Sequence, residues 1–238
     1  MQLNDDVHVL PLSMVRDGQT RTLNLSLIVD PAEGPTLVDT GLPGQLDQIA
    51  SALAEAGVGL QDLRRIVLTH QDVDHVGSLP DLVEATGALV LAHEVEAPFI
   101  DGRERPRFDR PEFLQAFPQM AGFLERMKQM RVDEALPDGA LLDLAGGVRV
   151  VATPGHTIGH MCLYLERTRT VIAGDALVAE NGRLQGPSPT ATADLPTASR
   201  SVRRLAGLDV DAIVCYHGGV VADGAGDQLR RVADELAP

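Results

Sequence analysis

The sequence predicts an α/β fold that forms one domain over residues 1–238. Short apolar runs that end at polar residues are typical of strands, and segments with apolar residues at helical spacing lie between them. A chain of 238 residues with 44% hydrophobic content is large enough for one substantial core. Because only 3% of the residues are aromatic, aliphatic side chains must fill most of that core.

The first part of the chain predicts strands at residues 7–12, 23–29, 36–38, 64–68 and 88–92. The dipeptide Asp17-Gly18 predicts the turn between the first two strands. Pro43 is expected to open a helix that continues to about Ala56, and a second helix is expected over residues 79–85.

The second part predicts strands at residues 141–144, 148–152, 161–165, 170–173 and 210–215. Helices are expected over residues 196–206 and 228–236. The Asn181-Gly182 pair and the proline-containing segment 186–189 together predict one long loop before the helix at residues 196–206.

Residues 97–137 differ in character from the rest, and we interpret them as a helical insertion. Five prolines interrupt this stretch, which also holds every phenylalanine of the chain. Residues 113–130 predict one or two short helices. The insertion could simply pack on the core, or it could form a lid whose Phe and Met side chains line a substrate pocket. The two interpretations are compatible.

The segment with the clearest chemistry is residues 66–77, in which four potential metal ligands follow a hydrophobic strand. These ligands are His70, Asp72, Asp74 and His75. A turn after the strand lets them converge on one point, and imidazole with carboxylate suits zinc, iron or manganese. The alternative is a polar loop in which Asp72 or Asp74 caps the following helix.

Three more potential ligands, His156, Asp175 and His217, each follow a predicted strand. Such positions can gather at one edge of a sheet. The sequence resembles the metallo-β-lactamase-fold hydrolases at these positions and at Asp39 in Asp-Thr-Gly, in the order that the family shows. The resemblance implies a four-layer αβ/βα sandwich. Position 72 departs from the family, because it is Asp where the common His-x-His-x-Asp-His signature has His.

The resemblance implies two groups of metal ligands, one of His70, Asp72 and His156 and the other of Asp74, His75 and His217. Asp175 would bridge two divalent ions, zinc being expected and manganese or iron the alternatives. Asp74 is also assigned as catalytic, and Asp39 and His160 would support the ligands from behind. A hydroxide shared by the metals would be the nucleophile. A ligating Asp72 would add a third carboxylate and make the centre less positive.

Four other residues with reactive or titratable side chains are expected to have structural roles and not to be metal ligands or catalytic groups. Cys162 and Cys215 lie in apolar runs and are expected to be buried free thiols. His93 is expected to be hydrogen-bonded near the site, with metal ligation as the alternative. Tyr216 is expected in the core, with assistance to an oxyanion as the alternative.

The net charge of −14 argues against nucleic acid or an anionic membrane as a partner. A small-molecule substrate is expected. No apolar run approaches the roughly 18 residues of a membrane span. The first residues show no signal peptide, so a cytoplasmic location is expected.

We therefore expect a dinuclear metal-dependent hydrolase of a small ester, lactone or related acyl compound. A glyoxalase-II-like thioesterase is an alternative, although only 21 residues follow His217, too few for the helical domain that glyoxalase II adds. A β-lactamase-type hydrolase and an iron enzyme that uses oxygen are further alternatives. The alternative outside enzymes is a metal-binding sensor.

Overall fold

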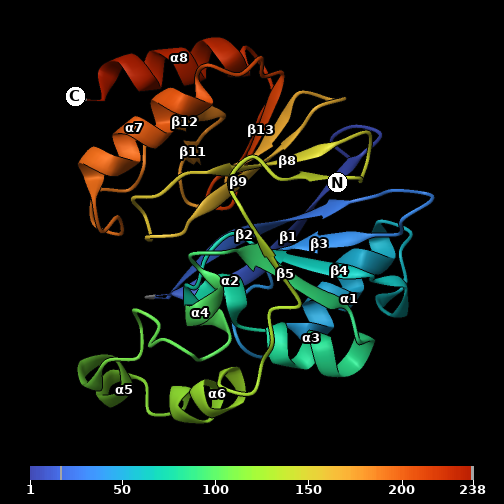
Figure 1. The fold of residues 1–238 in the computed structure, drawn as a ribbon, viewed down its shortest axis with the longest axis vertical. Helices are drawn as coiled ribbons and strands as arrows, with labels where there is room; N and C mark the ends of the chain where they lie inside the picture. Colours follow the sequence, from blue (N-terminus) through green and yellow to red (C-terminus); the bar gives the residue numbers. More distant parts are fainter. Residues whose placement is uncertain (17, 237–238) are drawn as a thin grey trace.

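Two six-stranded sheets face one another at the centre of the part of the chain that the computed structural model describes, residues 1–16 and 18–236 (Figure 1). The first sheet has the order β1-β2-β3-β4-β5-β6 and the second β14-β13-β10-β9-β8-β7. The strands of the first sheet are β1 Val7–Arg16, β2 Gln19–Ile28, β3 Thr36–Val38, β4 Arg65–Leu68, β5 Leu89–His93 and β6 Glu134–Leu136. Those of the second are β7 Leu141–Leu142, β8 Val148–Ala152, β9 Met161–Leu165, β10 Thr170–Ile172, β13 Ala212–Cys215 and β14 Gly219–Val221.

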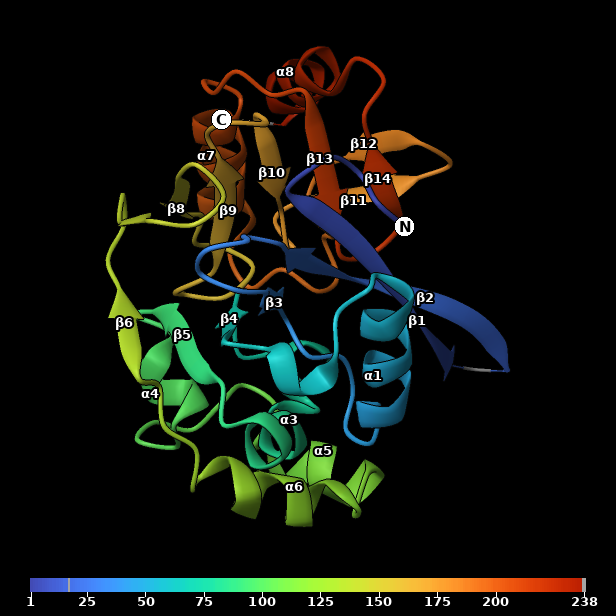
Figure 2. The ribbon, with the colours of Figure 1, turned by 90° about the vertical axis from the view of Figure 1, so that its right-hand side faces the viewer.

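Helices cover the outer face of each sheet, which gives the four layers that the resemblance implies (Figures 1 and 2). The first sheet carries α1 (Leu46–Glu55) and α3 (Leu79–Thr86), and the second carries α7 (Leu195–Leu205) and α8 (Ala225–Glu235). The short helix α2 (Val73–Val76) and the 3₁₀ turn at Leu60–Asp62 lie in connections of the first half. The prediction of an α/β sandwich is confirmed.

The strands are apolar on both faces because each sheet lies between two layers. In β4, Ile66 and Leu68 pack toward α1 and α3, whereas Val67 lies in the core between the sheets. In β9, Leu163 joins the same central core, whereas Cys162 packs toward α7 and α8. Side chains of a strand alternate between faces, so continuous apolar runs are required here.

The insertion contains α4 (Ala97–Ile100), α5 (Pro111–Ala116) and α6 (Met120–Met127). Helix α6 buries Met120, Phe123, Leu124 and Met127 in the same cluster as residues of α1 and α3. Helices α5 and α6 form the lowest part of the molecule in Figures 1 and 2. The expected short helices are therefore present, and one of them packs on the core.

The prediction of a long loop that includes residues 181–189 is wrong for its first part. Strands β11 (Val178–Glu180) and β12 (Arg183–Gln185) form a separate hairpin, with Asn181 and Gly182 as its turn. Both turn residues have positive φ, 51° and 74°, which is the conformation that an Asn-Gly hairpin turn requires. The strands are only three residues long, too short for an alternating pattern to show.

The predicted turn at Asp17-Gly18 falls in part outside the described residues, since Asp17 is not among them. Both cysteines are buried and free, as expected. No helix in residues 1–16 and 18–236 is long and apolar enough to cross a membrane.

Candidate metal centre

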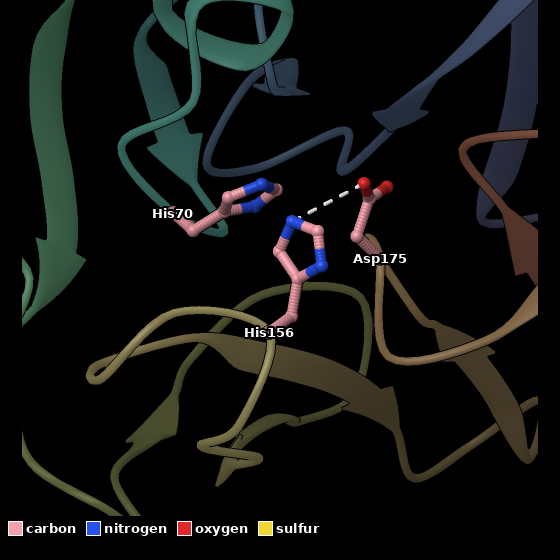
Figure 3. Close-up of side chains that lie close together, drawn as sticks. All are labelled: His70, His156 and Asp175. Atoms are coloured by element: carbon pink, nitrogen blue, oxygen red, sulfur yellow. Dashed lines mark ion pairs between the residues drawn. The ribbon is translucent and has the colours of Figure 1, made fainter. Parts of the chain in front are cut away.

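Two groups of potential metal ligands lie at the end of the interface between the two sheets. The first contains His70, His156 and Asp175, and the second contains Asp74, His75 and His217. Within each group the donor atoms lie within 4.8 Å of one another. Figure 3 shows the first group converging, with His156 Nε2 3.4 Å from Asp175 Oδ2.

Both halves of the fold contribute to this centre. The loop after β4 and the helix α2 supply His70, Asp74 and His75, and the ends of β8, β10 and β13 lead to His156, Asp175 and His217. Asp175 Oδ1 lies 3.4 Å from His75 Nε2, and Asp175 Oδ2 lies 3.5 Å from His217 Nε2. The carboxylate therefore stands between the two groups. That this carboxylate bridges two ions stays a prediction.

The donor atoms fit bound cations. His70 Nε2, His75 Nε2 and Asp175 Oδ1 are buried and have no hydrogen-bond partner among the described residues. A buried polar atom without a partner costs about 1–3 kcal/mol, so three of them at one point would be unfavourable without a ligand. Imidazole nitrogens and carboxylate oxygens are suitable donors for divalent transition metals.

The electrostatics of the centre also favour cations. Burial alone lowers the pKa of His75, but the carboxylates of Asp39 and Asp175 outweigh it and raise the pKa well above its ordinary value. Burial raises the pKa of Asp175, but His75 and His217 outweigh it and hold the pKa well below its ordinary range. The carboxylates therefore stay ionised and attract positive charge, either protons or metal ions.

His217 shows the same balance at a more open position. Burial lowers its pKa, but hydrogen bonding to Asp175 and Asp74 outweighs this and raises the pKa to about 9. Its Nε2 lies 3.4 Å from Asp74 Oδ2. A metal ion that binds here must displace the proton that the carboxylates otherwise hold on the imidazole.

Asp39 contacts the metal loop and the far side of the His75 ring. Its Oδ1 accepts a hydrogen bond of 2.8 Å from the Thr69 backbone N–H, and its Oδ2 lies 2.9 Å from His75 Nδ1. The residue has a φ of 64°, which orients the carboxylate back toward the loop. With Nδ1 engaged in this way, His75 presents Nε2 to the centre.

His160 holds the backbone of a ligand rather than joining either group. Its Nε2 accepts a 3.0 Å hydrogen bond from the Asp175 N–H, and its Nδ1 lies 2.8 Å from Thr153 Oγ1. Burial, with the nearby His70, holds the pKa of His160 well below its ordinary value, so the ring is neutral. A Cβ at position 174 would lie 2.7 Å from His160 Nε2, which explains the glycine before Asp175.

Asp72 lies beside the first group but is not a member of it. Its Oδ2 is 3.1 Å from His156 Nε2 and 3.4 Å from His70 Nε2, and both carboxylate oxygens accept hydrogen bonds from Arg107. Burial raises the pKa of Asp72, but the hydrogen bond with His156 and the nearby His70 and Arg107 side chains outweigh it and hold the pKa well below its ordinary value. Asp72 stands at the N-cap of α2 without a capping hydrogen bond from its side chain. Its role as a ligand stays a prediction.

Two residues that contact the loops of the centre, Glu96 and Arg107, were not predicted from the sequence. Glu96 is fully buried and accepts hydrogen bonds from the Gln71 N–H at 2.9 Å and the Gly159 N–H at 2.8 Å. Arg107 comes from the insertion. Neither residue belongs to a recognisable motif, and their partners lie at least 25 residues away in sequence.

His93 and Tyr216 each contact neighbouring protein groups. His93 accepts a 3.3 Å hydrogen bond from the Val95 N–H and belongs to neither ligand group. Tyr216 is buried, its hydroxyl donates to the Asp74 carbonyl, and its ring centroid lies 3.8 Å from that of His75. Both contacts agree with the structural interpretations of these residues.

Three adjoining cavities open onto the centre. The smallest, about 240 Å³, is lined by ligand residues together with Arg21 and Arg107. A cavity of about 670 Å³ lies on the side of the insertion, where Phe108 and Phe113 line it. A more polar cavity of about 1140 Å³ includes Arg21 and Asn24 of β2. A substrate at the centre would thus meet an apolar wall on one side and a polar wall on the other.

Comparison with known proteins gives relatives along nearly the whole chain. The Probable metallo-hydrolase YflN of Bacillus subtilis (strain 168) is 29% identical, over 88% of this chain and 90% of that protein. The Atrochrysone carboxyl ACP thioesterase of Aspergillus fumigatus is 26% identical, over 82% of this chain but 38% of that protein.

Solved structures show the same fold. The crystal structure of a metallo-beta-lactamase family protein from Thermus thermophilus is 30% identical, with a TM-score of 0.69, over 99% of this chain and 79% of that chain. The family model of the Metallo-beta-lactamase superfamily matches residues 20–217, which include all the ligand positions described above. The chain therefore belongs to the metallo-β-lactamase superfamily.

Proposed function

We propose that this protein is a dinuclear metal-dependent hydrolase that cleaves a small ester, lactone or related acyl compound. The observation that carries the proposal is the pair of three-residue donor groups with Asp175 between them. When bound, two divalent ions would supply an acidified water and polarise the substrate carbonyl. The names of relatives such as the Probable metallo-hydrolase YflN support hydrolysis.

The protein's own residues hold and shape the site. His70 and His156 are the candidate ligands of one ion, Asp74, His75 and His217 those of the other, and Asp175 stands between them. Zinc suits this mixture of imidazole and carboxylate, and manganese or iron remain the alternatives because oxygen donors suit harder ions.

The cavities support a substrate with an apolar group on one side of the reacting carbonyl and a polar group on the other. Phe108 and Phe113 offer apolar contact area on the insertion side, and Arg21 and Asn24 offer hydrogen-bond donors on the β2 side. The reacting carbonyl would lie between them, in the small cavity lined by Asp74 and His217.

A thioester is the second candidate class. One relative is named as an acyl carrier protein thioesterase, although this chain spans 38% of its length. Thioester hydrolysis needs the same attack on a carbonyl and differs only in the leaving group, so the same donor groups could serve it.

The experiment combines metal analysis with turnover. Protein saturated with zinc, manganese or iron should hold two equivalents, and one of these forms should hydrolyse a member of a panel of aryl esters, lactones and acyl thioesters. His75→Ala should lose metal and turnover, whereas His8→Gln, on β1 and outside both donor groups, should retain both. At most one equivalent at saturation would refute the dinuclear site. Tight metal binding without turnover of any panel member would favour a sensor.

A further inference from the structure

The side chain of Arg107 connects the insertion to both halves of the candidate metal centre. Its Nε and Nη2 donate to the two carboxylate oxygens of Asp72. Its Nη1 donates to the carbonyls of His156, at 3.0 Å, and of Ala191, at 3.1 Å. The remaining N–H of Nη2 lies 3.1 Å from His156 Nε2. Four of the five N–H groups of the guanidinium are therefore donated to oxygen acceptors of the protein.

The backbone at this position is fixed as well, because the Arg107 N–H donates to Gln71 Oε1 at 2.8 Å. Gln71 and Asp72 belong to the metal loop between β4 and α2, whereas residue 107 lies between α4 and α5 of the insertion. The contacts of Arg107 thus join the insertion to three other segments, at residues 71–72, His156 and Ala191, which lie far apart in sequence.

The other arginines of the insertion make different contacts. Arg103 and Arg105 are exposed and pair with Asp101 and Asp109 of the insertion itself. Arg126 does reach the body of the protein, where it pairs with Asp81 and Glu84 of α3 on the surface. Arg126 is therefore a matched comparison, an insertion-to-body ion pair away from the metal ligands.

We propose that Arg107 is the charge partner of Asp72 beside the metal centre and that this ion pair latches the insertion to the metal loop. Because Asp72 is buried, its carboxylate needs a partner, and a bidentate guanidinium supplies both charge and hydrogen bonds. The Arg107 guanidinium adds one positive charge beside the ligands and so compensates the additional carboxylate of Asp72 that distinguishes this metal loop. The latch rests on the proposed metal site, but it does not depend on which substrate is cleaved.

The first measurement is the rate at which subtilisin cleaves the native protein within residues 101–110. Arg107→Gln and Asp72→Asn each break the ion pair and should each raise this rate about tenfold. The double variant should be cleaved no faster than the faster single variant, since both changes remove one interaction. Arg126→Gln should match the wild-type rate. An unchanged rate in Asp72→Asn would refute the latch.

The second measurement is metal affinity, by zinc titration against a chromophoric chelator. Arg107→Gln removes a cation beside the ligands and should raise affinity, whereas Asp72→Asn removes an anion and should lower it, each by about tenfold. Arg107→Lys keeps the charge but not the bidentate contact, so it should retain wild-type affinity while the segment is cleaved faster.

The direction of these shifts separates charge compensation from damage to the fold. A fall in affinity in both Arg107→Gln and Asp72→Asn would show structural damage and overturn the charge-partner role. If wild-type protein binds no zinc, the proposed function fails, yet the cleavage rates still decide whether the ion pair latches the insertion.

Discussion

Glu96→Gln is the substitution for which the structure gives the clearest expected loss in the free energy of unfolding. Glu96 is fully buried immediately before α4, and its two carboxylate oxygens accept the N–H groups of Gln71 and Gly159. Gln71 belongs to the metal loop of the first half, and Gly159 belongs to the loop between β8 and β9 in the second half. A Cβ at position 159 would lie 2.7 Å from the Glu96 carboxylate, so glycine is required for this contact.

The expected cost follows from the number of acceptors lost. Glutamine has the volume of glutamate but only one acceptor oxygen, and its NH₂ group would face the other N–H. One buried N–H group would lose its partner, which costs about 1–3 kcal/mol. Glu96→Ala would leave both N–H groups without partners and should cost about twice as much.

The assay is urea unfolding of metal-free protein, with Glu94→Gln as the control because Glu94 is an exposed neighbour of the same type. Hydrogen exchange should show that the Gln71 and Gly159 amides are the ones that lose protection. If Glu96→Gln unfolds within about 0.5 kcal/mol of the wild type, the two hydrogen bonds do not stabilise the loops and the reasoning is wrong.

Three further predictions concern the centre and the insertion. Because the raised pKa of His217, about 9, stabilises the folded state only while the imidazole is protonated, metal-free protein should lose thermal stability as the pH rises from 6.5 through 9. Replacement by Gln should flatten this dependence in a pH series of melting temperatures. Asp39→Asn removes the partner of His75 Nδ1 and should weaken zinc binding about 10- to 100-fold, with exposed Asp47→Asn unchanged in the same titration. A competitive inhibitor of turnover should slow proteolysis at residues 101–107, and equal rates with and without it would contradict the lid.

The ligand positions could be predicted because each one lies in the short connection that follows an apolar strand. The strand fixes the backbone, and the two facing sheets bring the ends of β4 and β10 to the same end of their interface, so His70 and Asp175 meet although they are 105 positions apart in sequence. The four layers were implied by the resemblance to the family, and strands such as β4, which are apolar on both faces, agree with them.

The contacts of Arg107 and Glu96 could not be predicted in this way. They depend on where a proline-rich connection folds back, and no periodic pattern determines that path. The expectation that Asp72 makes the centre less positive considered only residues of the motif. The structure places a guanidinium against that carboxylate, and its charge has the opposite sign.

Tyr216 can serve as an intrinsic fluorescence probe of the candidate metal centre because it contacts His75 and Asp74. The chain has no tryptophan and two tyrosines, so near-ultraviolet absorbance and emission come from Tyr164 and Tyr216 with a weak contribution from phenylalanine. Tyr164 donates its hydroxyl to the Asp209 carbonyl on the helical side of the second sheet, whereas Tyr216 lies against the His75 ring and bonds the Asp74 carbonyl. Changes in tyrosine emission on loading with metal should therefore report on the ligands themselves, and Tyr216→Phe should abolish the change without a label having been introduced.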